Sequence, residues 1–270
     1  MKICCFGDIH YHGSGEKLIE LANEVREKCA NTDVIVVVGD ISGNGNLGFV
    51  SELLSAIKFV ASTPILVVPG NHDIYLSLEE RGKGINSLLK LSLFNGVVER
   101  AGCIPLMKKP FVSGNVGFVG TIGWYDYSFA PEWLNLSLED FRKKHYGMYV
   151  WADRDFVELP FSDEEFTLML LNKFEEQIRE IHDKVDTIVA VMHHIPFREL
   201  VHYKLKPEWD YFSTFMGSEA FGHTIRKYRD KIKLVLHGHQ HNEVETGECK
   251  EAYGIKCYNC ATSNPLLIEL

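Results

Sequence analysis

The chain has 270 residues, of which 46% are hydrophobic and 24% are charged. These proportions are typical of a globular protein that can bury a sizeable core. The formal net charge is −9 and no polybasic tail or stripe occurs, which argues against a dedicated binder of nucleic acid or anionic membranes. The apolar runs are too short to span a membrane or to form a signal-peptide core, so we expect a cytoplasmic protein.

The cysteines do not indicate a disulfide-rich protein. There are seven, an odd number, and their spacing suggests no disulfide framework. We expect Cys4 and Cys5, which lie in the first apolar run, to be small buried thiols. Cys257 and Cys260 form one C-x-x-C, but no second pair or suitably spaced histidine pair accompanies it, which disfavours a structural zinc site.

The first 70 residues predict alternating strands and helices. Strands are expected at Ile3–Phe6, Val34–Val38 and Ile65–Val68, and helices at about 16–30 and 47–60. The wholly apolar, β-branched run Val34–Val38 is typical of a strand that is buried on both faces. This order predicts β-α-β units and a parallel sheet with right-handed crossovers.

The rest of the chain continues with further strands and one long helix. Ser162 opens a Ser-Asp-Glu-Glu capping box, which predicts a helix that runs to about residue 184. The inward face of this helix is expected to carry Leu168, Leu171, Phe174, Ile178 and Ile181. Further strands are predicted at Val116–Ile122, Thr187–Met192, Lys233–Leu236, Glu243–Thr246, Gly254–Tyr258 and Leu266–Glu269.

The region near 124–165 is rich in Trp, Tyr and Phe and has no clear period. Its aromatic rings can stack a base or cover a site, although the core of a cap is the favoured interpretation. No internal repeat or Pro/Gly-rich linker divides the chain. We therefore expect a single domain over residues 1–270, with an insertion or cap near 124–165.

Polar side chains follow five of the predicted strands, at the point where each strand ends. In an open α/β sheet, ligands bind outside the carboxyl ends of the strands. One such residue alone is most often a helix N-cap or a solvated loop histidine, but five such segments together indicate a site. The candidate metal-ligating residues are Asp8, His10, Asp40, Asn71, one of the pair His193 and His194, His239 and His241.

The types of side chain indicate what is bound. Imidazole nitrogens combined with carboxylate and amide oxygens suit transition metals, with Mn, Fe or Zn expected. Seven ligands are too many for one ion with an open position, and they suit two divalent ions that share a carboxylate. A two-metal site holds a hydroxide and grips the oxygens of an in-line phosphoryl displacement, so the expected chemistry is phosphoester hydrolysis.

In their order and spacing these residues resemble the calcineurin-like metallophosphoesterase superfamily. The motifs are Asp8-Ile9-His10, Gly39-Asp40, Gly70-Asn71-His72-Asp73, His193-His194 and Gly238-His239-Gln240-His241, and they span nearly the whole chain. The resemblance implies an α/β (α+β) fold. The implied fold is a four-layer α/β/β/α sandwich of two mixed β-sheets flanked by helices, with a dimetal centre at the carboxyl ends of the strands.

The resemblance also implies roles for individual residues. One metal would take Asp8, His10 and His241, and the other would take Asn71, His239 and His193, with His194 as the alternative ligand. Asp40 would bridge the two ions. His72 matches the catalytic histidine, which would assist the leaving group while a metal-bridging hydroxide attacks. Asp73 would orient His72 or a loop amide.

One departure from the family bears on the substrate. The Ser/Thr protein phosphatases of the superfamily carry an arginine shortly after the second motif, where this chain has Asn44. This disfavours a protein phosphatase, and Asn44 either donates a hydrogen bond to phosphate or holds a turn. We expect a small phosphodiester or phosphomonoester substrate, with nucleotides included. The alternatives are a nuclease of the same superfamily, which the composition disfavours, and a non-catalytic metal-binding scaffold for protein contacts.

Overall fold

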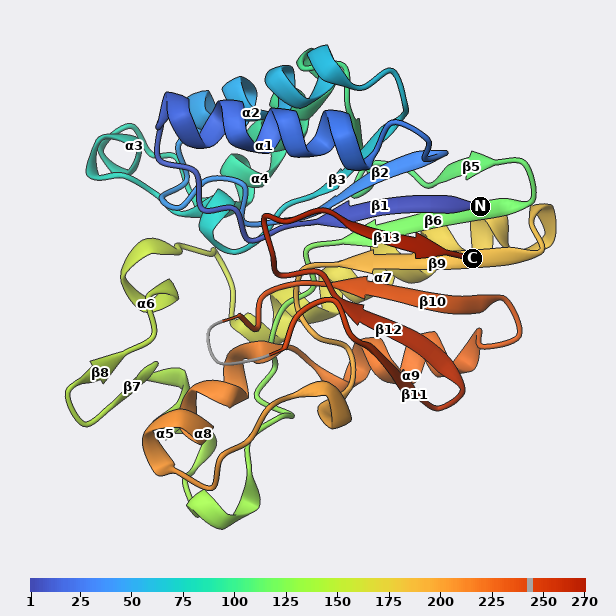
Figure 1. Cartoon of the computed structure of the whole chain (residues 1–270). Coiled ribbons are helices and arrows are strands. Elements are labelled where there is room, and N and C mark those ends of the chain that lie inside the picture. Colours follow the sequence, from blue (N-terminus) through green and yellow to red (C-terminus); the bar gives the residue numbers. More distant parts are fainter. Residues whose placement is uncertain (242–244) are drawn as a thin grey trace.

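The computed structural model describes residues 1–241 and 245–270. Two mixed β-sheets are stacked on each other, one with the strand order β13-β1-β2-β3-β4 and one with the order β11-β12-β10-β9-β6-β5 (Figure 1). The strands of the first sheet are β1 (Lys2–Phe6), β2 (Val34–Val38), β3 (Ile65–Val68), β4 (Ile104–Pro105) and β13 (Leu266–Glu269). Those of the second are β5 (Phe111–Ser113), β6 (Val116–Thr121), β9 (Thr187–Met192), β10 (Ile232–His237), β11 (Cys249–Ala252) and β12 (Ile255–Asn259).

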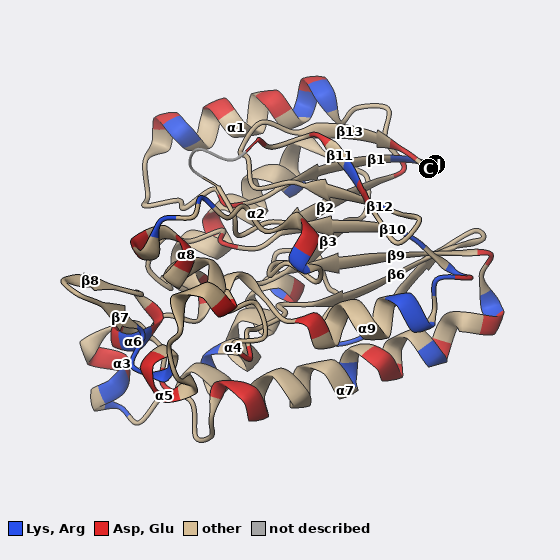
Figure 2. Ribbon diagram, turned by 90° about the horizontal axis from the view of Figure 1, so that it is seen from below, with Lys and Arg blue, Asp and Glu red and all other residues tan. Residues whose placement is uncertain are grey.

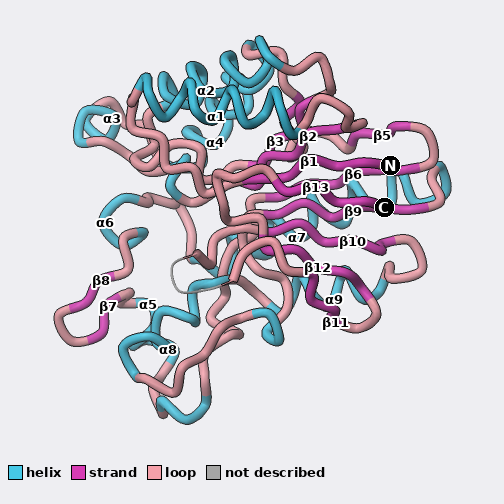
Figure 3. Tube along the Cα trace, viewed as in Figure 1, coloured by secondary structure: helices cyan, strands magenta, loops and turns pink. Residues whose placement is uncertain are grey.

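The central strands of both sheets run parallel to their neighbours. β1, β2, β3 and β4 pair in parallel, as do β6, β9, β10 and β12. Within these two sheets, the antiparallel pairs among the described residues involve β13, β5 and β11, each at an edge of its sheet. The expected parallel sheet is therefore confirmed, and the arrowheads in Figure 1 put the carboxyl ends of β1, β2, β3, β9 and β10 on one side of the molecule. Figure 3 shows the loops that lie on this side, drawn in pink.

Helices cover the two outer faces of the stacked sheets. The first sheet is covered by α1 (Gly15–Lys28), α2 (Leu47–Val60) and α4 (Ser87–Arg100), and the second by α7 (Asp163–Ile181) and α9 (Glu219–Lys227). The fold is thus the four-layer sandwich that the sequence predicts. Lys and Arg are mixed with Asp and Glu along α1 and α7, so neither helix carries a stripe of one sign (Figure 2).

The alternation of side chains along a strand explains the layers. On β1, Cys4 and Phe6 pack in the apolar cluster that contains α1, α2 and α4. Ile3 and Cys5 point the other way, into the cluster between the two sheets. Because both faces are covered, β2 is buried at every residue, as its apolar run predicts.

The long helix α7 begins where the sequence predicts. The side chain of Ser162 accepts from the backbone N–H of Glu165, and the Glu165 carboxylate accepts from the backbone N–H of Ser162. The prediction of which residues face inward is partly wrong, because Leu168 is 56% exposed, whereas Phe166 and Leu170 are buried. Phe166 packs edge to face against the buried Trp124, with ring centroids 5.1 Å apart, so the first turns of α7 bury Phe166 in place of Leu168.

The sequence did not predict α4 or α9, nor the short helix α3 (Leu78–Gly82). Two residues of the expected strand at 243–246 lie outside the described part of the chain, and the other two, Glu245 and Thr246, are not in a strand. The described strand nearest to it is β11, at 249–252. No helix among the described residues is both long and apolar enough to cross a membrane.

The prediction of a buried free thiol is wrong for Cys4 and confirmed for Cys5. Cys4 and Cys29 form a disulfide, while Cys5, Cys257 and Cys260 are buried free thiols. Cys29 lies 25 residues after Cys4, at the C-terminal end of α1, and the helix returns it to the face of β1 that carries Cys4. The cytoplasmic location stays a prediction, and the disulfide does not favour it, because cytosolic proteins rarely keep disulfides.

A cap lies beyond the carboxyl ends of the strands (Figure 1). We use this name for residues 124–162 together with 200–216. The elements of the cap are α5 (Leu138–Arg142), β7 (His145–Tyr146), β8 (Tyr149–Val150), α6 (Asp153–Phe156) and α8 (Pro207–Ser213). The favoured interpretation of the aromatic residues holds for Trp124, Tyr125 and Phe129, which are fully buried, but not for Tyr149, which is exposed.

Candidate metal centre

The strand-end loops deliver the candidate ligands to one place. Each predicted residue lies within four positions of the end of a strand. Asp8 and His10 follow β1, Asp40 follows β2, Asn71 follows β3, His193 follows β9, and His239 and His241 follow β10. The stacked sheets place these five loops side by side, as the motif order predicts.

Four of these residues have a left-handed backbone, which is rare for non-glycine residues. The φ angles are 50° at Asp8, 45° at His10, 48° at Asp40 and 71° at His239. Such a conformation costs of order 1 kcal/mol per residue and persists where the surrounding structure imposes it. Its concentration in the strand-end loops is typical of a functional site.

Two glycines let the backbone approach the carboxylates closely. A Cβ atom on Gly70 would lie 2.1 Å from Asp40 Oδ1, and one on Gly238 would lie 2.4 Å from Asp8 Oδ2. Neither position therefore has room for a side chain. The glycines of the predicted motifs are thus required by the packing of the loops around Asp8 and Asp40.

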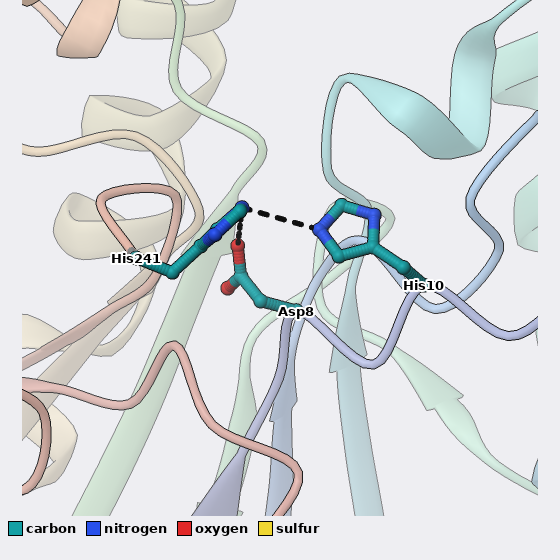
Figure 4. A group of neighbouring side chains, drawn as sticks. All are labelled: Asp8, His10 and His241. Atoms are coloured by element: carbon teal, nitrogen blue, oxygen red, sulfur yellow. Dashed lines mark hydrogen bonds and ion pairs between the residues drawn. The ribbon is translucent and has the colours of Figure 1, made fainter. Parts of the chain in front are cut away.

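The first group of side chains consists of Asp8, His10 and His241 (Figure 4). Nε2 of His241 lies 3.8 Å from Asp8 Oδ1 and 3.3 Å from His10 Nε2. Both imidazoles therefore direct a ring nitrogen toward one point, beside the carboxylate oxygen. Two unprotonated ring nitrogens and a carboxylate oxygen at such distances fit a shared divalent cation.

The second group is built around His193. Its Nε2 lies 3.2 Å from Asn71 Oδ1, 3.1 Å from His239 Nδ1 and 3.5 Å from Asp40 Oδ2. Its Nδ1 must donate to the carbonyl oxygen of Val38, at 2.8 Å, because a carbonyl can only accept. This bond places the proton on Nδ1 and leaves Nε2 of neutral His193 able to bind a cation.

Asp40 lies between the two groups. Its Oδ2 is 3.7 Å from His10 Nε2 on one side and 3.5 Å from His193 Nε2 on the other. Its Oδ1 accepts from the backbone N–H of His72 at 2.9 Å, which fixes the carboxylate plane. Of the two carboxylates, Asp40 is the one positioned to serve both groups.

The neighbouring His194 lies beside His239, with ring centroids 4.2 Å apart. Its Nδ1 donates to the carbonyl oxygen of Ile122 at 3.0 Å, and its Nε2 is buried without a hydrogen-bond partner among the described residues. Nε2 of His239 is also buried and unpartnered there. His193 is therefore better placed than His194 to join Asp40 and His239, as the first choice from the sequence requires.

Burial and neighbouring charges set the pKa values of the site. Burial opposes a charge on His193, but Asp40 and Asp8 raise its pKa to about 9. Burial also opposes a charge on Asp40, yet His193 and His72 hold the pKa of Asp40 well below its usual range. Asp40 and His193 thus form a buried ion pair in the metal-free protein.

In the first group, burial shifts the pKa values of Asp8 and His10 toward the uncharged forms. Burial raises the pKa of Asp8 to about 6 and lowers the pKa of His10 to about 4. His10 is therefore neutral at pH 7, the state in which an imidazole binds a metal. The group needs little proton release to accept a cation.

His72 sits at the exposed edge of the site. Its Nδ1 donates to the carbonyl oxygen of Gly43 at 3.0 Å, and its Nε2 lies 3.9 Å from Asp40 Oδ2. Its ring stacks on Tyr75, with centroids 4.4 Å apart. Burial lowers the pKa of His72, but Asp40, the carbonyl of Gly43 and Asp153 together outweigh it, so the net shift of the pKa is upward. The hydrogen bond and the stacked ring thus orient His72, and the raised pKa favours its charged form.

Asp73 orients amides of the strand-end loops and not the ring of His72. Its carboxylate accepts from the backbone N–H groups of Gly70 at 2.9 Å, Ser42 at 2.8 Å and Ile41 at 3.3 Å. Burial raises its pKa to about 7, although these N–H groups favour the charged form. Of the two roles that the sequence allowed, orienting loop amides is the one the structure has.

Asn44 is exposed and takes part in the turn that precedes α2. Its Oδ1 accepts from the hydroxyl of Ser42 at 3.1 Å and from the backbone N–H of Asn46 at 3.3 Å. The left-handed residue of this turn is Gly45, with φ of 73°. The contacts favour a turn role for Asn44, as one of its two interpretations predicts.

Asp153 is the residue that the sequence did not single out. This fully buried carboxylate of the cap accepts hydrogen bonds at 2.8 Å from Asn71 Nδ2, Tyr75 Oη, Tyr125 Oη and Trp151 Nε1. The bond to Nδ2 turns Oδ1 of Asn71 toward His193. No motif could have revealed it, because Asp153 lies 82 residues from Asn71 in an aperiodic segment.

The comparisons with known proteins concern the family and the fold of the chain. The sequence model of the calcineurin-like phosphoesterases matches residues 1–243. No curated protein matches significantly. The structure resembles TT1561 of Thermus thermophilus, with 10% identity, 97% of this chain and 90% of that chain covered and a TM-score of 0.54. It also resembles GAP50, the anchor in the inner membrane complex of Plasmodium, with 15% identity, coverage of 97% and 72% and a TM-score of 0.53. The chain belongs to the calcineurin-like phosphoesterase family.

Proposed function

We propose that the protein is a dimetal-dependent phosphoesterase (a phosphoric ester hydrolase) that acts on a small phosphomonoester or phosphodiester. The observation that carries the proposal is the position of Asp40 Oδ2 between two groups of metal-binding side chains, 3.7 Å from His10 and 3.5 Å from His193. One group is Asp8, His10 and His241, and the other is Asn71, His193 and His239, with Asp40 shared between them.

The donor set suits two divalent transition metals, with Mn, Fe or Zn preferred over Mg. Four imidazoles bind transition metals better than the hard, oxygen-preferring Mg²⁺. When bound, two such ions activate water and neutralise the oxygens of a transferring phosphoryl group. Asp8 and Asp40 hold the negative charge that such ions require, and Asp73 keeps the loops in register.

His72 supplies the proton chemistry. Its Nδ1–H is held by Gly43, so its Nε2 faces the region beside Asp40 where a phosphoryl group would bind. The raised pKa of His72 favours a proton on Nε2, and this proton can pass to the oxygen of the leaving alkoxide. His72 therefore acts as a general acid and not as a nucleophile.

A non-catalytic scaffold is the second candidate function, because one protein of similar fold is described as an anchor. Such a likeness concerns the fold alone. A scaffold has no need of a proton donor beside Asp40, whereas this chain orients His72 with one hydrogen bond and one stacked ring. The orientation of His72 therefore supports a catalytic role over a scaffold role.

The test uses hydrolysis of bis(p-nitrophenyl) phosphate and p-nitrophenyl phosphate. Protein stripped with a chelator is reconstituted separately with Mn, Fe, Zn and Mg, and the metal content is measured in the same samples. We expect turnover of at least one ester with Mn, Fe or Zn, and a return to background in excess chelator. Protein that binds two ions but hydrolyses neither ester with any metal would contradict the enzyme proposal and favour the scaffold.

A further inference from the structure

A cavity of about 560 Å³ opens between the cap and the candidate metal centre. His239 and His241, one from each group of candidate ligands, form part of its wall. The rest of the wall is Tyr149, Val150, Trp151, Lys206, Glu208, Trp209, Phe212, Ser213, Met216 and Gln240. A volume of several hundred Å³ suits a small molecule and is far too small for a folded partner.

The aromatic walls are held in place by the protein itself. Trp151 stacks on Phe215, with centroids 5.3 Å apart and planes 13° apart, and its Nε1 donates to Asp153. Trp209 donates its Nε1 to the carbonyl oxygen of His202 at 2.7 Å. Because both indole N–H groups are satisfied, these rings offer their faces and not a hydrogen-bond donor to an occupant of the cavity. One face of Trp209 is covered by Lys204, whose Nζ lies 3.4 Å from the ring centroid, which leaves the other face for stacking. Pre-positioned rings lose little entropy on stacking.

Polar groups are interspersed among the rings. Lys206, Glu208, Ser213 and Gln240 all line the cavity. The Oε1 of Gln240 accepts from the backbone N–H of His202 at 3.0 Å, which leaves the amide N–H₂ as a donor. A hydrocarbon chain would use none of these groups. A ring with nitrogen and oxygen substituents can use both the aromatic walls and the polar groups.

We propose that this cavity binds a flat heteroaromatic ring on the organic part of the substrate, which makes nucleotides the preferred class of phosphoester. The inference rests on the proposed function for the phosphoryl end, since His239 and His241 border the cavity. The binding of the ring itself depends only on the cap. Trp209 and Phe212 are then specificity-determining residues.

The first experiment compares adenosine 5′-monophosphate with ribose 5-phosphate, which have the same leaving oxygen and differ only in the base. If the enzyme prefers diesters, the methyl diesters of the same two compounds replace them. We expect kcat/KM to be about 10- to 100-fold higher for the nucleotide, the range that one base-stacking contact gives. In Trp209→Leu and Phe212→Leu this ratio should fall toward one.

Control variants separate a local effect from misfolding. Trp133→Leu alters a partly exposed tryptophan of the cap that does not line the cavity, and it should keep the ratio of the wild type. Trp209→Phe keeps a ring at the same position and should restore most of the ratio. Circular dichroism of each variant verifies that it is folded. Equal ratios in the wild type and in both Leu variants would overturn the proposal.

The second experiment measures binding of adenosine to the chelator-treated protein by calorimetry, with octanol as the hydrocarbon probe. Adenosine should bind the wild type, and about 10-fold more weakly the Trp209→Leu variant. Met148 and Leu205 are exposed apolar residues next in sequence to Tyr149 and Lys206 of the cavity wall, so a hydrocarbon chain is the alternative occupant. Tighter binding of octanol, or faster hydrolysis of octyl phosphate than of the nucleotide, would overturn the proposal.

The two experiments distinguish the two levels of inference. Adenosine binding without hydrolysis of any phosphoester would support the cavity assignment and contradict the proposed enzyme. Hydrolysis of ribose 5-phosphate and adenosine 5′-monophosphate at equal rates, without adenosine binding, would support the enzyme and contradict the cavity assignment.

Discussion

The strand-end loops and the cap are built by opposite means. The loops hold charged and polar side chains on a left-handed backbone at Asp8, His10, Asp40 and His239, with glycines where atoms approach closely. The cap holds its shape by stacked aromatic rings that pack around Trp151. The loops thus concentrate charged and polar groups, whereas the cap presents an ordered, largely aromatic surface. Under the function and the cavity assignment proposed above, reactivity and selectivity would be supplied by separate parts of this chain.

The two regions meet at a few contacts. Asp153 of the cap accepts from Asn71 of the β3 loop, and the ring of Trp151 lies 5.7 Å from that of His239 in a T-shaped arrangement. The cap therefore bears directly on the second group of candidate ligands. Four predictions test how far the two regions are independent, and they run from the largest expected effect to the smallest.

Asp40→Ala should have the largest effect, because Asp40 is shared by both groups. We expect bound metal to fall from about two ions per chain to one or none, with phosphoesterase activity at background. Metal analysis after gel filtration checks this. Asp183→Ala, at a side chain that is 96% exposed, is the matched control and should retain both ions. Two ions per chain in Asp40→Ala would show that Asp40 does not bridge.

His72→Ala should lower kcat by about 10²- to 10⁴-fold and leave both ions bound, because a general acid is lost and not a ligand. Steady-state kinetics and metal analysis of the same preparation measure the two effects. His223→Ala, at an exposed histidine on α9, is the control and should keep full activity. Loss of an ion from His72→Ala would instead place His72 among the ligands, in the group that it forms with His10 and Asp40.

Asp153→Asn tests the contact between the regions. The change keeps the shape but places an N–H₂ group against donors, so Asn71 should lose its orientation. We expect the affinity for the second metal to weaken by about 10- to 100-fold, the usual range for a partner that orients a ligand. Calorimetric titration with Mn²⁺ measures it, and Asp155→Asn, at an exposed carboxylate on the same helix, should match the wild type. An unchanged affinity would mean that the loops hold Asn71 without the cap.

The smallest expected effect is the pH dependence of the stability of the metal-free protein, which we attribute to His193. The folded state raises the pKa of His193 to about 9, above its ordinary value of about 6.5. His193 therefore contributes stability that is fully present below about pH 6.5 and is lost as the pH rises through about 9. We expect Tm of the chelator-treated protein to fall by roughly 5 °C over this window.

Thermal unfolding followed by circular dichroism at a series of pH values checks the prediction. His193→Gln removes the titrating group and should flatten the profile between pH 6.5 and 9. A profile of the same slope in His193→Gln would assign the loss of stability to other groups.

Much of the candidate site could be predicted from the sequence, because its residues come directly after strands. Strand ends are visible in the apolar runs, and parallel strands bring their ends to one edge. The choice of His193 over His194 was harder, since both follow β9. It depends on which ring nitrogen faces Asn71 and His239, and the hydrogen bond from His193 to Val38 settles that orientation.

The sequence could not predict contacts between distant, aperiodic segments. The Cys4–Cys29 disulfide and the hydrogen bond from Asn71 to Asp153 both join residues whose positions follow from packing and not from local periodicity. The helix α4 was missed as well, although Asn86 caps its first turn. The burial of Phe166 in place of Leu168 is of the same kind, because Phe166 packs against Trp124, which lies 42 residues earlier in the chain.

The sequence by itself determined the order of strands and helices and the set of polar residues at the strand ends. These two features follow from local patterns, namely the period of the apolar residues and the residues that end each run. The four-layer fold was implied by the resemblance of the motifs to a known family and not by any local pattern. Only the tertiary structure decided which atoms meet: Asp40 between two histidine groups, Asp153 behind Asn71, and an aromatic cavity beside His239. Such contacts depend on the packing of whole layers and on the path of the aperiodic cap, and no local pattern encodes either.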